Sequence, residues 1–255
     1  MGSPAGRARE HLVREGLIQI IVPVYNEGEN VLHLYKCLQA ENVPFDRLRF
    51  IYDQDTDTTL PFVTSLRAAD SRVEAVKNEY GPGVIRALRF GFDRTEPGPV
   101  IVLMGDLSDK LSIVPDMIQL WQEGTTLVSP SRYMPGGRQH GGGLVKSALS
   151  RGAGVSLGLL GFPTSDPTNN FKLYDGSWLR RQRIESEGGF EVALELCYKA
   201  YVQREPIRQL PTEWFDRTAG ESRFRLRAWL PRYLRWWLRA TGAVLQERLG
   251  GSRLR

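Results

Sequence analysis

Short apolar runs alternate with helical patterns along the first half of the chain, and this alternation limits the fold more than any other feature. The apolar runs are residues 17–24, 48–52, 73–76, 100–103 and 126–129. Helical periodicity occupies residues 28–39, 58–69, 84–92 and 112–121. Since parallel strands are joined by crossover helices, we predict an α/β fold with a mostly parallel, open, Rossmann-like sheet and helices on both faces. Asn26 and Glu29 predict a capping box before the first helix.

Three of the predicted strands end in acidic residues. These are Glu27 after the first strand, Asp53, Asp55 and Asp57 after the second, and Asp106 and Asp109 after the fourth. Ligands of α/β proteins bind at the carboxyl edge of the sheet, and clustered carboxylates need a compensating charge there. The pattern therefore predicts a divalent cation that carries a nucleotide diphosphate. An ordinary turn after the fourth strand, with Asp109 capping the next helix, is the alternative.

Several motifs in a fixed order resemble those of one enzyme family. Residues 21–27 (IVPVYNE) and 131–137 (SRYMPGG) are similar to two signatures of family 2 glycosyltransferases, which have the GT-A fold. Further similar segments are residues 78–91, 150–153, 165–174, 189–191 and 217–223. The resemblance spans residues 17–224 and is strongest to the polyprenyl-phosphate branch, the group of the dolichyl-phosphate mannosyltransferases.

The resemblance implies an inverting glycosyltransferase. It would move a hexose of mannose or glucose type from a nucleotide diphosphate sugar to a polyprenyl, dolichyl-type phosphate at a membrane surface, with Mg²⁺ or Mn²⁺ as cofactor. GDP- and UDP-sugars are the expected donors, and the nucleobase stays open. A phosphate monoester has a second pKa of about 6, so the acceptor oxygen is already ionised near neutral pH and needs no strong general base.

The expected site residues fall into three groups. The donor nucleotide is expected to contact Pro23, Tyr25, Glu27, Asp53 and Asp106. The expected metal ligands are Asp106, Ser108 and Asp109. Because guanidinium groups bind phosphate oxygens in pairs, the expected phosphate and acceptor contacts are Arg132, Arg151, Arg217, Ser222 and Arg223. Among all of these, the expected catalytic residues are Asp106, Arg132 and Arg217.

Two positions depart from the family pattern. Met104 stands where the family commonly has the first Asp of an Asp-x-Asp motif, so metal binding would rest on Asp106 with Ser108 or Asp109. Tyr52 stands where relatives usually carry the first Asp of an Asp-Asp pair, and Asp53 is kept. A tyrosine can stack or donate one hydrogen bond but cannot accept as a carboxylate does, which bears on nucleobase recognition.

Three alternatives stay open. A sugar or natural-product hydroxyl as acceptor would require a carboxylate base, for which Asp166 and Glu191 are the candidates, although either could equally cap a helix or turn. A non-catalytic module that binds a nucleotide sugar would explain Met104. A nucleic-acid-binding protein would use the basic tail. The last two leave the ordered arginine motifs unexplained, so we expect no nucleic-acid partner.

The tail differs from the rest of the chain. Residues 217–255 contain ten arginines and two acids, a net charge of 10 − 2 = +8. Leucine and tryptophan recur there at helical spacing, which predicts basic amphipathic helices that lie on an anionic membrane surface or pack on the protein body. Pro231 predicts the start of a second helix. The expected organisation is a polar arm at residues 1–16, a GT-A domain at 17–223 and amphipathic helices at 224–255.

Other features bear on location. Cys37 and Cys197 lie in helical patterns without the spacing of a zinc site or disulfide frame, which favours a reducing, cytoplasmic setting. The polar start lacks a signal-peptide core, and no apolar run is long enough to span a bilayer. We therefore expect a peripheral protein at the cytoplasmic face of a membrane, with its oligomeric state open. The glycines around Arg138–His140 predict a lid over the donor or a disordered surface loop, and His140 is too isolated to be a metal ligand.

Overall fold

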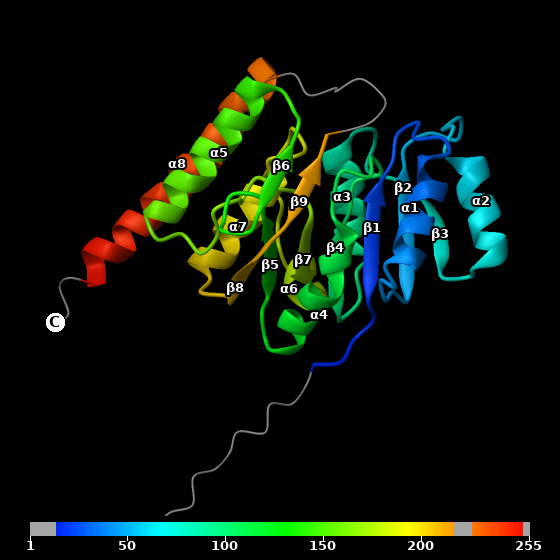
Figure 1. Cartoon of the computed structure of the whole chain (residues 1–255), viewed down its shortest axis with the longest axis horizontal. Helices are drawn as coiled ribbons and strands as arrows, with labels where there is room; N and C mark the ends of the chain where they lie inside the picture. The colour runs from blue at the N-terminus through cyan, green and yellow to red at the C-terminus, as the bar shows by residue number, and fades with distance from the viewer. Residues whose placement is uncertain (1–13, 217–225, 252–255) are drawn as a thin grey trace, which may run out of the picture.

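A seven-stranded sheet forms the centre of the protein (Figure 1), for which a computed structural model describes residues 14–216 and 226–251. The strand order is β3-β2-β1-β4-β7-β5-β8. The strands are β1 (Gln19–Pro23), β2 (Arg47–Tyr52), β3 (Val73–Lys77), β4 (Pro99–Val102), β5 (Leu127–Ser131), β7 (Lys172–Asp175) and β8 (Ile207–Pro211). β7 runs antiparallel to β4 and β5, and the remaining pairs are parallel. The predicted α/β class with a mostly parallel sheet is confirmed.

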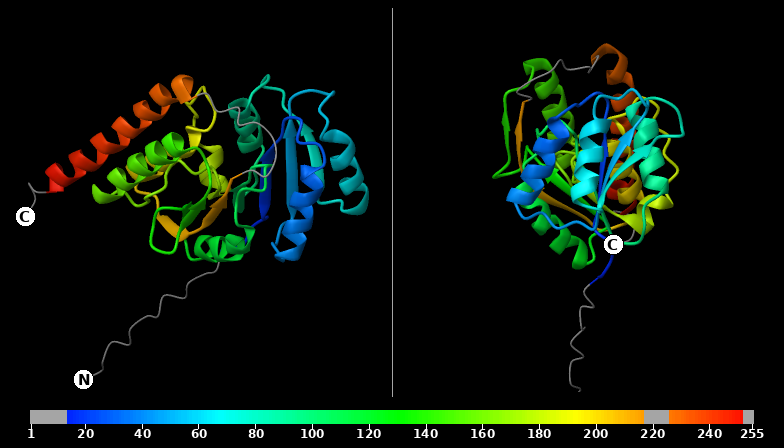
Figure 2. Two further views of the ribbon diagram at one scale, coloured as in Figure 1. Left: turned by 45° about the horizontal axis from the view of Figure 1, so that its top comes forward. Right: turned by 90° about the vertical axis from the view of Figure 1, so that its right-hand side faces the viewer.

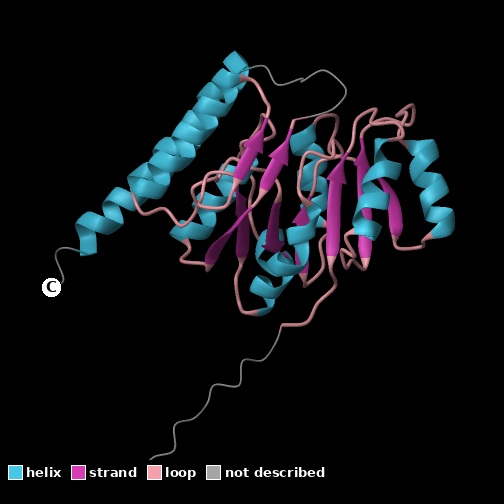
Figure 3. Cartoon of the chain, in the orientation of Figure 1, coloured by secondary structure: helices cyan, strands magenta, loops and turns pink. Residues whose placement is uncertain are grey.

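Helices cover both faces of this sheet, as predicted (Figure 3). They are α1 (Asn30–Ala40), α2 (Leu60–Ala69), α3 (Val84–Asp93), α4 (Val114–Gln122), α5 (Leu144–Leu159), α6 (Gly176–Arg180), α7 (Val192–Val202) and α8 (Leu226–Gly251). A second, two-stranded sheet pairs β6 (Arg138–His140) with β9 (Glu213–Phe215). The sequence prediction missed β6, β7, β8, β9, α5 and α6. The four strands and α6 are short and carry weak periodicity, and α5 contains three glycines, which disfavour a helix.

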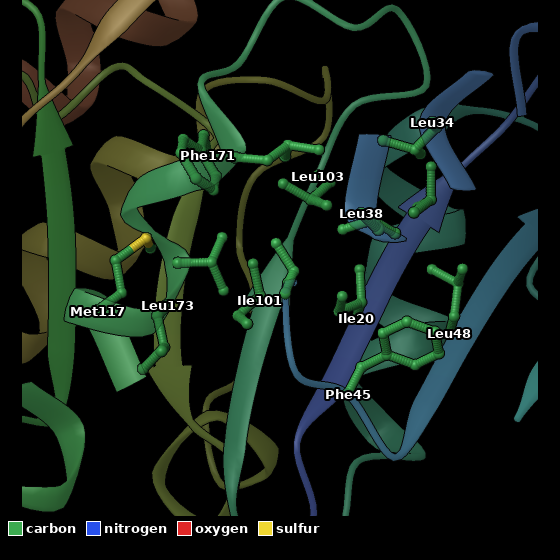
Figure 4. Packing of buried hydrophobic residues seen from close by; sticks show 14 of the residues in the cluster. Ile20, Leu34, Leu38, Phe45, Leu48, Ile101, Leu103, Met117, Phe171 and Leu173 are labelled. Carbon is green, nitrogen blue, oxygen red and sulfur yellow. The ribbon is translucent and has the colours of Figure 1, made fainter. Parts of the chain in front are cut away.

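The strand register explains the two hydrophobic cores. Ile20 lies opposite Leu48 and Ile101, and Ile101 lies opposite Leu173, so that these side chains share one face of the sheet. They pack against α1, α2 and α4 (Figure 4). Their neighbours along the strands, including Ile21, point to the other face because strand side chains alternate. There they pack against α3, α6, α7 and α8.

The predicted capping box is wrong. The first helix begins at Asn30, and Glu29 precedes it with no side-chain hydrogen bond to the helix end. Asn26 has a positive φ of 54°, and its side-chain oxygen accepts a hydrogen bond from the Thr58 amide at 3.1 Å instead. The Asn26 side chain therefore connects two loops at the carboxyl edge of the sheet rather than capping α1.

The prediction that Pro231 starts a second helix is also wrong, because α8 is one helix with Pro231 inside it. Pro231 lies in the second turn of α8, where proline removes one backbone hydrogen bond at a cost of about 3 kcal/mol. Packing compensates, since Trp236, Ala240 and Val244 are buried in the second core. Within residues 14–216 and 226–251, no helix is long and apolar enough to cross a membrane.

Candidate active site

The ends of β1 and β4 meet, as the parallel arrangement predicts. A Cβ atom placed on Gly105, just after β4, would lie 3.2 Å from Cγ of Glu27, which follows β1. Pro23 is buried as the last residue of β1, whereas Tyr25 is 43% exposed. The expected donor-binding residues of these two loops therefore share one region of the sheet edge.

Asp57 connects the loops after β1 and β2. Its carboxylate is 5% exposed and accepts hydrogen bonds from the backbone amides of Asn26, at 3.1 Å, and Thr59, at 2.8 Å. The Thr59 hydroxyl in turn accepts from the Glu27 amide at 3.0 Å. These bonds fix the backbone at Asn26 and Glu27, directly after Tyr25, which is a role that the sequence pattern did not reveal.

Asp53 connects β2 to the loop before α3. Its carboxylate accepts hydrogen bonds from the Asn78 side-chain amide at 2.8 Å and from the Gly83 backbone amide at 2.7 Å. Gly83 has a φ of +120°, a conformation that favours glycine. Asp53 therefore orders the loop beside the expected nucleotide position as well as offering carboxylate oxygens to it.

Replacing Asp53 with alanine is expected to weaken nucleotide binding. A hydrogen bond to a charged group contributes about 1.5–3 kcal/mol, so the dissociation constant for the nucleoside diphosphate should rise about tenfold or more. Calorimetric titration with UDP and with GDP measures this change. Asp55→Ala is the matched control, because Asp55 belongs to the same loop but is exposed and forms a surface ion pair with Lys77. Equal effects of the two substitutions would contradict the assignment.

Oxygen atoms from the loop after β4 form the expected metal site. The Asp106 carboxylate accepts hydrogen bonds from the Ser108 hydroxyl at 2.7 Å and from its amide at 3.2 Å. Desolvation and the nearby charge of Asp106 raise the pKa of the half-buried Asp109 to about 7, although Arg132 and the Met104 backbone act in the opposite direction. Asp106 and Asp109 are therefore close enough to repel each other.

These residues fit a hard divalent cation in part. Carboxylate and hydroxyl oxygens are the ligands that Mg²⁺ and Mn²⁺ prefer, and a cation would relieve the repulsion between Asp106 and Asp109. Among the residues that the structure describes, however, no group of three or more His, Cys, Asp or Glu side chains is arranged to hold a metal. A nucleotide diphosphate would have to supply the remaining ligands, as phosphates commonly do for Mg²⁺.

Arg132 forms a buried ion pair with Asp166. Its Nε donates to one carboxylate oxygen of Asp166 at 2.7 Å, and one Nη donates to the other at 2.9 Å. The Arg132 backbone amide adds a third hydrogen bond at 3.0 Å. Asp166 is fully buried, so the sequence prediction of Arg132 as a phosphate contact missed the carboxylate that already binds two of its nitrogens.

Buried polar groups continue beneath this ion pair. Lys172 is fully buried and donates to the Ser129 hydroxyl at 2.8 Å and to the Asp166 backbone carbonyl at 3.1 Å. Burial lowers the pKa of Lys172, and the two hydrogen bonds give its buried nitrogen polar partners. Lys172 therefore fixes the backbone of Asp166, and no periodicity or motif in the sequence indicated this contact.

Of the remaining predicted arginines, the structure describes Arg151 alone. Arg151 is exposed on α5, and its guanidinium carbon lies 6.0 Å from the centre of the Tyr133 ring. The guanidinium carbon of Arg132 lies 4.9 Å from the same ring centre, so the structure brings these two arginines together around one tyrosine. Arg217, Ser222 and Arg223 lie outside the residues that the structure describes.

Both candidate general bases have structural partners. Asp166 binds Arg132, as described above. Glu191 is 1% exposed, and its two carboxylate oxygens accept from the backbone amides of Gly188, at 2.6 Å, and Gly189, at 2.8 Å. Neither carboxylate is placed in solvent to accept a proton from an acceptor hydroxyl.

Residues 138–140 of the glycine-rich segment form strand β6 of the small sheet. The predicted alternative of a disordered surface loop is therefore wrong for these residues. Here β6 pairs with β9, and the Glu213 carboxylate binds both Lys110, at 2.7 Å, and His140, at 3.0 Å. β9 also contacts the expected metal loop, because the Phe215 amide donates to the Ser108 carbonyl at 3.0 Å. Whether this segment acts as a lid stays a prediction.

Comparison with known proteins adds independent information. Residues 19–184 match the family model described as glycosyl transferase family 2. The dolichol-phosphate mannosyltransferase of Pyrococcus furiosus is 23% identical over 220 residues, which are 82% of this chain and 59% of that protein. The bactoprenol glucosyl transferase of Shigella phage SfX is 31% identical over 118 residues, which are 45% of this chain and 39% of that protein. This chain thus spans between 39% and 59% of the length of these two relatives.

Solved structures share the fold. Glucosyl-3-phosphoglycerate synthase from Mycobacterium tuberculosis, solved with Mn²⁺, UDP and glucosyl-3-phosphoglycerate, superposes with a TM-score of 0.65 at 20% identity. The match covers 89% of this chain and 80% of that one. Together with the family match, this likeness confirms the predicted GT-A fold.

Proposed function

Because the chain belongs to glycosyl transferase family 2, we propose that it transfers a hexosyl group from a nucleotide diphosphate sugar to a polyprenyl phosphate, with inversion at the anomeric carbon. The relatives named for dolichol phosphate and bactoprenol support this class of acceptor. The proposed cofactor is Mg²⁺ or Mn²⁺, in keeping with structural neighbours solved with either metal and UDP. The proposed location is the cytoplasmic face of a membrane.

One observation carries the proposal. Asp106 and Asp109 lie near each other and near Arg132, at the edge of the sheet where β1 and β4 end. Such a site can hold a metal-bound diphosphate on the carboxylate side and a second anion on the arginine side. Holding two anionic reactants together is the main task of an enzyme whose nucleophile is a phosphate oxygen.

Each group has a proposed role. A divalent cation, when bound, would neutralise the charge that develops on the departing nucleoside diphosphate. Asp106, with Ser108 and Asp109, would hold that cation, while Pro23, Tyr25, Glu27 and Asp53 would position the nucleoside. The proposed acceptor contacts are Arg132 and Arg151, together with Arg217, Ser222 and Arg223 from the segment outside the described residues. We expect Arg132 to contact the acceptor phosphate while Asp166 balances part of its positive charge.

The environment of the two candidate bases supports a phosphate acceptor. A hydroxyl acceptor must lose a proton to a base within hydrogen-bond reach. Asp166 and Glu191 are both buried and already accept strong hydrogen bonds, from Arg132 and from two backbone amides respectively. A phosphate monoester needs no such base, since it is largely ionised near neutral pH.

The proposed activity can be tested with a lipid product assay. Full-length protein, vesicles that contain a polyprenyl phosphate, Mn²⁺ and a labelled nucleotide sugar should give label that extracts into chloroform. A screen of GDP- and UDP-linked mannose and glucose would identify the donor, which matters because Tyr52 replaces a carboxylate beside Asp53. Absence of a labelled lipid with every donor would refute the proposal.

A binding module without catalysis is the second candidate, and Met104 favours it. A thioether replaces the first carboxylate of the usual pair, which leaves fewer oxygen ligands for the metal. This function predicts calorimetric binding of a nucleotide sugar in the presence of Mn²⁺ with neither lipid product nor hydrolysis. The lipid assay separates the two candidates directly.

A further inference from the structure

α8 exposes a row of leucines along one side. They are Leu230, Leu234, Leu238, Leu245 and Leu249, and each is between 42% and 72% exposed. At about 100° of rotation per residue, these positions fall within one sector about 100° wide. The row is therefore a continuous apolar stripe and not a set of scattered surface leucines.

The other two sides of α8 already have partners. One side enters the second core through Trp236, Ala240 and Val244. Another side carries Arg235 and Arg239, which bind the Glu185 carboxylate at 3.5 and 3.1 Å. Among the residues that the structure describes, the leucine stripe is the side of this helix on which the large apolar side chains stay exposed and join neither hydrophobic core.

α5 extends the apolar stripe. The two helices lie side by side beyond the edge of the main sheet (Figures 1 and 2), and Trp237 of α8 donates a hydrogen bond to the Ala153 carbonyl of α5 at 3.2 Å. Leu149 lies one turn before Ala153, and Leu234 lies about one turn before Trp237. Apolar side chains of both helices therefore flank the line of contact. We define the α5–α8 face as the leucine stripe of α8 together with Val145, Leu149 and Leu159, which are 41–80% exposed.

The charge of the two helices favours one occupant. Residues 144–159 contain one lysine, one arginine and no acid, and residues 226–251 contain five arginines and one glutamate, a sum of 2 + 5 − 1 = +6. Two copies packed along these helices would bring like charges together, whereas an anionic bilayer offers hydrocarbon to the leucines and complementary charge to the basic residues beside them. We propose that the α5–α8 face docks on the surface of an anionic lipid bilayer. This inference rests on the proposed function, which places the acceptor in a membrane.

The position of Arg151 connects this face to the active site. Arg151 lies two residues after Leu149, about 200° around α5, so it is on the other side of the helix, near the Tyr133 ring that Arg132 also approaches. A bilayer seated on the leucines would therefore lie across α5 from an arginine of the expected acceptor site, about one helix diameter (roughly 10–12 Å) away. Docking would present a lipid-linked phosphate to the protein without extraction of its chain from the membrane.

Vesicle co-sedimentation of the full chain tests the inference. Wild-type protein should sediment with vesicles that contain phosphatidylglycerol and less with pure phosphatidylcholine. The Leu234→Glu/Leu238→Glu variant and the Leu149→Glu variant should each reduce the partition coefficient about tenfold or more, because charged groups replace buried hydrocarbon. Leu17→Glu is the matched control. Leu17 is an exposed leucine just before the amino-terminal end of β1, and it does not belong to the α5–α8 face. Unchanged binding of both leucine variants would overturn the inference.

Three further measurements make every outcome informative. Light scattering reports self-association, and a wild-type dimer that the double variant converts to monomer, with vesicle binding unchanged, would assign the face to a second copy. Transfer to a short-chain polyprenyl phosphate in detergent separates docking from catalysis. Retained transfer by a variant that has lost vesicle binding supports the inference, and vesicle binding without any transfer refutes only the proposed function. Thermal unfolding near the wild-type temperature confirms that these exposed substitutions leave the fold intact.

Discussion

Replacing Asp106 with alanine is expected to reduce sugar transfer at least about a hundredfold, because the loop after β4 would lose its principal carboxylate for the metal. Asp106 is only partly buried, so the free energy of unfolding should change little. Initial rates of labelled lipid formation, measured across a range of Mn²⁺ concentrations, give the effect. Asp116→Ala is the control, since Asp116 is an exposed acid at the start of α4.

Substitutions around Asp106 refine this prediction. Met104→Asp restores the usual pair of carboxylates and should lower the Mn²⁺ concentration needed for half-maximal activity. Asp109→Ala should raise that concentration if Asp109 compensates for the methionine. Retention of more than half of the activity by Asp106→Ala would exclude a metal role for this carboxylate.

Replacing Asp166 with alanine is expected to destabilise the protein strongly and to abolish activity. Arg132 has a side chain only 12% exposed, and it would be left without its carboxylate partner. Breaking a buried ion pair by removing one partner costs about 3–5 kcal/mol. For a chain of this size, that loss should lower the unfolding temperature by roughly 6–20 °C. Calorimetry and the lipid product assay measure the two effects.

A surface pair provides the matched control. Arg208 and Glu123 also lie 2.7 Å apart, but their side chains are 54% and 45% exposed. Glu123→Ala should therefore change stability by no more than about 1 kcal/mol. Asp166→Asn keeps the shape of the side chain and should be less destabilising than Asp166→Ala. If Asp166→Ala unfolded at the same temperature as Glu123→Ala, the buried pair would have no structural importance.

Much of the fold was predictable because its first half obeys simple rules. Strands β1 to β4 are buried apolar runs, and the helices between them show clear 3.6-residue periodicity. Errors arose where tertiary contacts overrode local signals. Asn26 has a good capping side chain, yet Thr58 from a distant loop binds it. Proline is common at the first position of a helix, yet Pro231 lies inside α8, which core packing around Trp236 keeps continuous.

The sequence alone identified some residues of the candidate site but not the contacts between them. Acids after parallel strands are visible in a sequence, because the direction of a parallel strand fixes the edge at which its end lies. The contacts of Asp57, Lys172 and Asp166 were not visible, since each depends on a partner 30 or more residues away or on burial. The two interpretations of the tail, packed helix and membrane helix, do not exclude each other. One side of α8 is packed in the core, and another is exposed.

The antiparallel direction of β7 determines which residues around it reach the ligand-binding edge of the sheet. A parallel strand delivers to the ligand-binding edge the residues that follow it, whereas an antiparallel strand delivers those that precede it. Asp166 comes before Lys172, the first residue of β7, and this explains why a carboxylate so far along the chain reaches Arg132 after β5. In proteins of mixed sheet direction, functional residues should therefore be sought upstream of each reversed strand as well as downstream of the others.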